Sequence, residues 1–327
     1  MTLSVAPDAA QAAPTTTSAT ARLDRLNQQA DQLVEQYLQS NLALERTRSN
    51  LAAVQRDTQS AQRSYDDLRS RIAAQAASAY VNGPGTDLAA VLTSGDPTSA
   101  VERMQSLELL AQQNTELVTD LVTARQSLDA TRATLRSVEG QQAAEVTRLR
   151  AKKAEVQKAV DQTRTLLDQM RAADRARAAA QSRRQAVASR PATQASPAAR
   201  QGPSPAPPPV SGSAGVVVRW AYQQLGKPYQ WGAAGPGSFD CSGFTMAAWR
   251  QAGVSLPHSA ASQYGVTARI SAGELRPGDL IFRYSPISHV SLYVGGGMQI
   301  AATHTGDVVR LQSASLPSIT GYGRPGG

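Results

Sequence analysis

The single cysteine of this 327-residue chain, Cys241, stands in the string FDCSGF (residues 239–244), at the expected start of a helix. The three histidines, His258, His289 and His304, all follow it. One thiol cannot form an internal disulfide, and a lone cysteine followed by candidate bases indicates a thiolate nucleophile. Backbone N–H groups at a helix start stabilise a thiolate. The alternative is a cysteine that packs as a small apolar side chain, but the small and polar neighbours of Cys241 favour the nucleophile.

Aromatic side chains are concentrated in the part of the chain that must position this cysteine. All three Trp, all three Phe and six of the nine Tyr follow residue 215, whereas the first two hundred residues are rich in Ala, Gln, Arg, Leu, Ser and Thr. Only the C-terminal part therefore has the side chains for a globular core. We predict a disordered segment at 1–21, a helical region at 22–185, a Pro/Ala/Ser-rich linker at 186–213 and a globular domain at 214–327.

The helical region carries a heptad pattern. A seven-residue spacing of mostly apolar residues runs from Leu23 to Ala79, with an interleaved series from Leu26 to Leu68, although Ser40, Thr47 and Thr58 weaken its middle. A second long helix is expected from near Thr98 to Met170. A Gly/Pro-containing stretch with a short helical elbow at 87–92 separates the two. The pattern predicts an all-α coiled-coil hairpin. Parallel self-association through the same seam is the alternative, so the oligomeric state stays open.

Charge and hydropathy restrict the partners. The formal charge of +8 is concentrated around residues 148–200, a run typical of a solvated helix face. This run has no interleaved aromatic residues for base stacking, so we predict no nucleic-acid partner. Apolar stretches are shorter than the ~20 residues of a membrane span. Residues 10–12 resemble a cleavage site without a complete signal peptide before it, so export is inferred from the type of domain alone.

The C-terminal domain reads as helices followed by strands. Helices are expected at 216–225 and 242–252, and a strand enters after the turn at 275–279. Residues 288–294 alternate with period two and lead through three glycines into a returning strand at 298–304. This order predicts an α+β domain.

Five motifs in this domain resemble one family. They are GxPYxxG at 226–232, DCSGF at 240–244, LP at 256–257, RPGDL at 276–280 and HVxxYVG at 289–295. In this order they closely resemble the NlpC/P60 family, papain-like cysteine peptidases of bacterial cell walls. The likeness covers residues 213–325, and the preceding coiled coil and linker look like those of secreted actinobacterial Rip-type endopeptidases. The resemblance implies a cysteine-bearing helix on an antiparallel sheet that bears a histidine.

The resemblance also implies roles for individual residues. Cys241 takes the position of the nucleophile and His289 that of the general base and then acid. Tyr229 matches a tyrosine near the active site, while Asp240 and Ser242 match positions that hold the amino end of the substrate. Tyr229 is alternatively a core aromatic, and Ser242 a helix cap.

The sequence departs from the family at the third catalytic position. Ala301 stands where the returning strand usually carries a histidine or another polar residue. Alanine cannot orient the imidazole of His289, and His304 lies three residues further on, so we name His304 as the candidate third residue. A third residue chiefly orients the base, and the expected enzyme is therefore active but slow. His258, after Leu256-Pro257, is interpreted as a surface or subsite residue.

The sequence thus predicts a secreted, wall-associated endopeptidase for peptidoglycan stem peptides, commonly cut in this family between D-γ-glutamate and meso-diaminopimelate. No cofactor is expected, and one cysteine with three scattered histidines lacks the spacing of a metal site. The hypothesis for the hairpin is control: it covers the catalytic groove until a regulatory protein moves it. The alternatives are a degenerate wall-binding scaffold that recruits another hydrolase, and an amidase or acyl transferase that uses the same Cys-His pair.

Overall fold

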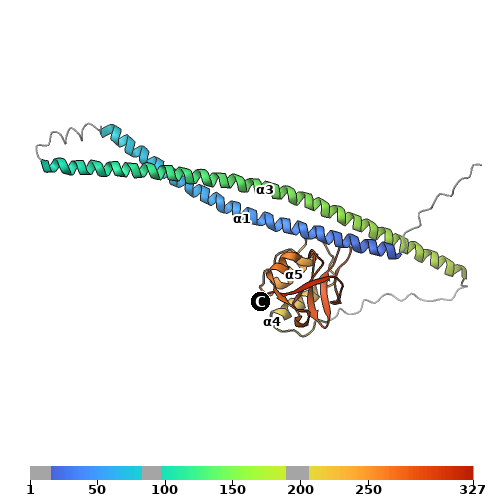
Figure 1. Ribbon diagram of the computed structural model, residues 1–327. Coiled ribbons are helices and arrows are strands. Elements are labelled where there is room, and N and C mark those ends of the chain that lie inside the picture. Colours follow the sequence, from blue (N-terminus) through green and yellow to red (C-terminus); the bar gives the residue numbers. More distant parts are fainter. Residues whose placement is uncertain (1–15, 83–96, 189–205, 327) are drawn as a thin grey trace, which may run out of the picture. The chain divides into compact units, whose positions relative to one another are not determined.

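The computed structural model describes residues 16–82, 97–188 and 206–326. Two long helices make up the N-terminal region, α1 (Thr16–Asn82) and α3 (Pro97–Ala188), as Figure 1 shows. Helix α1 begins within the segment 1–21 for which we expected disorder. The elbow expected at 87–92 and most of the linker expected at 186–213 lie outside the described residues.

The two helices pair in antiparallel order within one chain. Val34 of α1 shares a buried apolar cluster with Val160 of α3. Further along α1, Gln62 accepts a hydrogen bond of 2.6 Å from Arg132 of α3. The partner number on α3 falls as the residue number on α1 rises. The predicted all-α hairpin is therefore present, and its seam is used within the chain.

The chain divides into two compact units, residues 43–147 and residues 1–42 with 148–327. In the described part of the first unit, three apolar residues are buried: Leu44, Leu128 and Val138. The second unit contains the C-terminal domain together with one end of each long helix. No stretch of the helices in the described ranges has the length and apolar character needed to cross a bilayer.

The C-terminal domain has three helices, a 3-10 turn and six strands among the described residues. They are α4 (Gly212–Gln223), α5 (Cys241–Arg250), α6 (Ala260–Val266), β1 (Ala268–Ile270), η1 (Ala272–Glu274), β2 (Leu280–Arg283), β3 (His289–Gly295), β4 (Met298–Ala302), β5 (Val309–Ser313) and β6 (Ile319–Arg324). The strands form one antiparallel sheet in the order β1-β6-β2-β3-β4-β5. Helices precede strands, so the predicted α+β class is confirmed.

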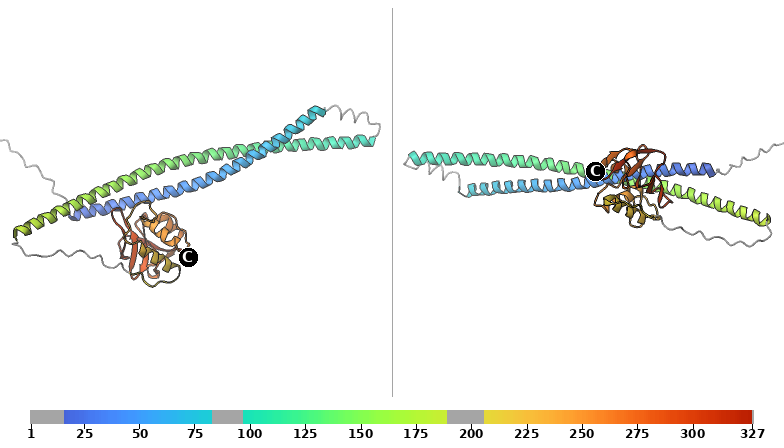
Figure 2. Two further views of the ribbon diagram at one scale, coloured as in Figure 1. Left: turned by 180° about the vertical axis from the view of Figure 1, so that it is seen from behind. Right: turned by 90° about the horizontal axis from the view of Figure 1, so that it is seen from below.

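Helix α5 packs against β3 and β4 of this sheet. Figure 2 shows the C-terminal domain from two further sides. Strand alternation decides which side chains α5 meets, because successive residues point to opposite faces. Val290, Leu292 and Val294 of β3 are buried in the core with Phe244 of α5. His289 therefore lies on the other face, at the first residue of the strand.

Candidate active site

Cys241 is the first residue of α5, and the residue before it caps the helix. Asp240 is extended (φ −92°, ψ 179°), and its Oδ1 accepts a 2.7 Å hydrogen bond from the Gly243 amide. The unpaired N–H groups of a helix start and the helix dipole favour an anion at this position. The cap therefore holds the thiol where a helix assists the thiolate.

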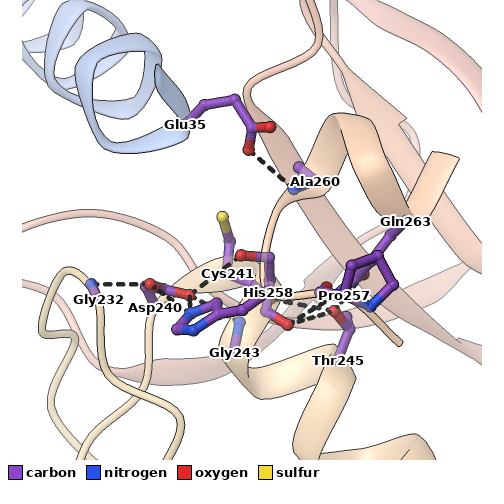
Figure 3. Close-up of polar contacts among 11 residues, drawn as sticks. Glu35, Gly232, Asp240, Cys241, Gly243, Thr245, Pro257, His258, Ala260 and Gln263 are labelled. Carbon is purple, nitrogen blue, oxygen red and sulfur yellow. Dashed lines mark hydrogen bonds and ion pairs between the residues drawn. The ribbon is translucent and has the colours of Figure 1, made fainter. Parts of the chain in front are cut away.

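The Asp240 carboxylate also joins two further segments to the start of α5. Its Oδ2 accepts from the Gly232 amide at 2.8 Å, and His258 Nε2 lies 2.9 Å from both carboxylate oxygens (Figure 3). Asp240 is completely buried. His258, interpreted from the sequence as a surface or subsite residue, is thus a direct partner of the residue that precedes the nucleophile.

Close packing around Gly243 fixes this arrangement. A Cβ at this position would lie 2.3 Å from the carbonyl oxygen of Ala233 and 2.9 Å from His258 Nε2, so only glycine fits. Gln263 of α6 links the DCSGF and LP motifs, because its amide donates to the carbonyls of Ser242 at 2.8 Å and Pro257 at 2.9 Å. The DCSG and LP motifs are therefore adjacent in space.

The start of strand β3 lies beside the start of α5. The backbone of Val290, the second residue of β3, hydrogen-bonds the Cys241 sulfur. His289 is 2% exposed, and neither ring nitrogen has a hydrogen-bond partner among the described residues. Asp31 Oδ2 of α1 lies 3.9 Å from His289 Nδ1, within ion-pair distance.

The third catalytic position holds no polar side chain on β4. Ala301 is fully buried and pairs with Arg310 of β5. His304 lies beyond the end of β4, where its Nδ1 is 3.2 Å from the Thr305 carbonyl and its Nε2 is 3.8 Å from Asp307 Oδ2. His304 and His289 line one cavity, but no hydrogen bond joins them in the described structure.

The other two predicted site residues lie close to Cys241. Ser242 is buried, and its hydroxyl donates to Asp240 Oδ1 at 3.3 Å. The residue that caps α5 is Asp240, so the interpretation of Ser242 as a helix cap is wrong. Burial raises the pKa of the Tyr229 phenol, and the charges of Asp31, Cys241 and Asp240 raise it further. The phenol therefore lies within the electrostatic reach of the nucleophile.

The outer face of α1 meets this site. Asp31 and Glu35 occupy heptad positions b and f, counted with Ala30 as position a, and such positions face solvent in a two-helix coiled coil. They are nevertheless only 7% and 5% exposed. Glu35 accepts hydrogen bonds from the Ser259 hydroxyl and from the amides of Ala260 at 2.8 Å and Ala261 at 3.2 Å. Figure 3 shows the contact with Ala260.

An aromatic contact accompanies these polar ones. The ring of Tyr37 on α1 meets Trp231 edge-on, with the ring centroids 5.3 Å apart. Trp231 follows the GxPY motif and also borders the apolar cluster of Val34 and Val160. The segment of α1 from Asp31 to Tyr37 thus contacts the loop before Cys241 and the start of α6.

Burial shapes the titration of the catalytic pair. It raises the pKa of the Cys241 thiol well above its ordinary value, and the charges of Asp240 and Asp31 add to this effect, against the opposing hydrogen bond from Val290. Burial lowers the pKa of His289 to about 3, with Arg283 and His304 contributing. Burial also raises the pKa of Asp31. The enclosed site therefore favours a neutral thiol beside a neutral imidazole.

Comparison with known proteins places this domain in a family. A model described as "NlpC/P60 family" matches residues 226–320, which are therefore an NlpC/P60 domain. Over 105 residues the chain is 46% identical to "Probable endopeptidase p60" of Listeria grayi and 40% identical to a probable endopeptidase of Mycobacterium bovis. Each match covers 32% of this chain but only 19% and 27% of those relatives.

A solved structure also matches about a third of this chain. The peptidoglycan hydrolase RipB of Mycobacterium tuberculosis is 29% identical, with a TM-score of 0.32, and the match covers 34% of this chain and 62% of that one.

Sequence reasoning missed four residues near the site. Asp31 and Glu35 fall at outer heptad positions and carry no signal except that Asn27, Asp31 and Glu35 recur at a spacing of four. Arg283 and Arg310 become neighbours of His289 and Ala301 only through strand register. His258 was noted, but its pairing with Asp240 depends on a contact across 18 residues.

Proposed function

We propose that this protein is a cysteine endopeptidase that hydrolyses peptidoglycan stem peptides, at the bond between D-γ-glutamate and meso-diaminopimelate. One observation carries the proposal: the NlpC/P60 match spans a cysteine at a helix start and a histidine on the adjacent strand. The relatives are named probable endopeptidases, and one solved neighbour is a peptidoglycan hydrolase. Such a substrate implies action outside the cell, at the wall.

The proposed chemistry has two steps. The Cys241 thiolate attacks the peptide carbonyl carbon, and the backbone N–H of Cys241 with a neighbouring donor stabilises the oxyanion. His289, as imidazolium, gives its proton to the leaving amine, and a thioester remains on Cys241. His289 then takes a proton from water, and the hydroxide attacks the thioester carbon. The carbon–sulfur bond breaks, which releases the acid product and restores the Cys241 thiolate.

The supporting residues act through position. Asp240 caps α5 and, with His258, fixes the turn before the nucleophile; Tyr229 and Ser242 are the proposed contacts of the amino end of the substrate. His304 is a proposed third residue that would orient His289 only after the loop beyond β4 moves, because no bond joins the two rings here.

Digestion of purified muropeptides tests the proposal. The full-length chain and Cys241→Ala are compared by mass spectrometry of the products. We expect new amino and carboxyl ends at one bond with the first protein and intact muropeptides with the second. Cleavage that survives in Cys241→Ala would refute the mechanism, and release of the sugar alone would refute the bond class.

We further propose that α1 inhibits the enzyme until a regulatory protein moves the helical hairpin. Support comes from the burial of Cys241 and His289, from the Glu35 contacts with Ser259, Ala260 and Ala261, and from pKa shifts that oppose a thiolate–imidazolium pair. Removing the helix lets water reach both groups, which reverses the part of each shift that burial by α1 causes.

Glu35→Ala in the full-length chain tests this control. The substitution removes the carboxylate from its three donors in the C-terminal domain, so we expect faster muropeptide turnover. Gln36→Ala, at the exposed adjacent position, is the matched control and should match the parent. Equal rates for all three proteins would refute inhibition by α1 and leave the endopeptidase proposal intact.

A further inference from the structure

A cavity of about 420 Å³ adjoins His289. One wall comes from α1, with Asp24, Arg25 and Asp31, and the other from the sheet and the loops at its edge, with Arg283 and Arg310. Two acidic side chains and one basic side chain of α1 thus share the cavity with basic side chains of the catalytic domain.

Strand register explains why the arginines are there. Arg283 of β2 pairs directly with His289 of β3, and Arg310 of β5 pairs directly with Ala301 of β4. Directly paired residues of an antiparallel sheet point to the same face. Two guanidinium groups therefore accompany the catalytic base and the alanine at the third position.

Arg283 is available for an anion. Its guanidinium donates to the Pro317 carbonyl at 3.0 and 3.2 Å and stacks on the Tyr284 ring at 4.9 Å, and within the described part of the chain no carboxylate lies within ion-pair distance of it. Its charge reaches the point beside His289 that Asp31 occupies: although burial raises the pKa of Asp31, Arg283 opposes that shift. Arg310 Nε lies 3.2 Å from Asp307 Oδ2 and is otherwise half in solvent.

We propose that Arg283 and Arg310 form a subsite for a carboxylate of the residue on the amine side of the scissile bond. This inference rests on the proposed function, in which His289 protonates the leaving amine, so that groups around His289 and away from Cys241 face the leaving residue. In the enclosed state Asp31 places a carboxylate in this cavity. An open enzyme offers the same cations to the substrate.

Two peptides that differ by one carboxylate test the subsite. Both contain L-Ala-γ-D-Glu, followed either by meso-diaminopimelate or by L-lysine, which lacks the distal carboxylate. The enzyme is the full-length chain with Glu35→Ala, because it is expected to be open. We expect kcat/KM to favour the diaminopimelate peptide by about tenfold or more, in line with a charge-assisted hydrogen bond.

Arg283→Gln and Arg310→Gln in this background should each reduce the preference, and the two together should bring the ratio close to one. Arg283→Lys keeps a positive charge and should retain part of the preference. Arg250→Gln, on the last turn of α5, is the matched control and should leave the ratio unchanged. Circular dichroism confirms that each variant is folded.

The outcomes separate this inference from the proposed function. Cleavage of both peptides at similar rates by the full-length Glu35→Ala protein would overturn the subsite but not the proposed endopeptidase activity. A proportional loss on both peptides in the arginine variants would assign them a structural role and likewise overturn the subsite. Absence of cleavage of either peptide by the full-length Glu35→Ala protein would overturn the proposed function and the subsite with it.

Discussion

The C-terminal domain and the helical unit of residues 43–147 differ in how much side chain they enclose. The domain buries Phe239, Phe244 and Phe282 completely, and the aromatic rings of Phe239 and Phe244 are in contact. The helical unit buries three apolar residues in its described part, and each keeps a small exposed fraction. Dense packing fixes atoms to fractions of an ångström, as catalysis requires. A long, thinly packed hairpin instead suits a region that positions or moves another part of the chain.

Removal of the helical region should have the largest effect, and it tests whether the two regions divide catalysis and control between them. If chemistry belongs to the domain alone and α1 restrains it, a fragment of residues 206–327 should cleave muropeptides faster than the full-length chain by about 10- to 100-fold, the usual range of regulatory coupling. The measurement is initial rate by chromatography. A fragment that is folded yet slower than the parent would show that the helices contribute to catalysis.

Truncation of one buried side chain in each region compares their packing through the free energy of unfolding. Phe244→Ala should lower the free energy of unfolding of the domain by about 3–5 kcal/mol, because its cavity lies within rigid surroundings. Leu128→Ala on α3 should cost only about 2 kcal/mol, because exposed neighbours can close around the gap. Tryptophan fluorescence follows unfolding of the domain, since all three tryptophans follow residue 215, and far-UV circular dichroism follows unfolding of the helical unit. Equal losses would contradict the contrast in packing.

The buried histidine predicts an acid sensitivity of the enclosed site. The pKa of His289 is lowered from 6.5 to about 3, so between these values the unfolded chain binds more protons and stability falls as the pH falls. From pH 6.5 to 4.5 the parent should therefore lose about 2 kcal/mol more than His289→Gln. Urea unfolding followed by tryptophan fluorescence measures this difference. Parallel pH profiles would show that His289 is not held neutral.

The smallest expected effect concerns the third catalytic position. Ala301→His places an imidazole diagonally across from His289, within reach of an aromatic side chain. Orientation of the base should raise kcat a few-fold, although a larger residue at a buried position costs about 1–3 kcal/mol of stability and offsets part of the gain. Unchanged kcat in a folded variant would show that the base is already oriented by another group.

Local signals were enough to predict the centre of the site from sequence. The DCSGF string predicted a helix start at Cys241, and period-two alternation predicted the strand of His289. Both are properties of residues next to one another in the chain. The domain's α+β order followed from the same local patterns.

The surroundings of the site needed information that local patterns lack. Heptad positions b and f predict exposure for Asp31 and Glu35, yet the domain covers them. Arg283 and Arg310 belong to the site only because of strand register, which turn geometry and bulges set. The roles given to Tyr229, Ser242 and His304 stay predictions until substitution tests them.

The contact between Glu35 and the start of α6 joins residues 224 to 226 positions apart in one chain. Tethering gives such partners an effective concentration near the millimolar range, so dilution of the protein does not separate them. The ribosome also makes α1 before the domain that α1 contacts. If α1 inhibits as proposed, each newly folded enzyme meets its inhibitor at once, and the inhibitor returns whenever the activating partner leaves.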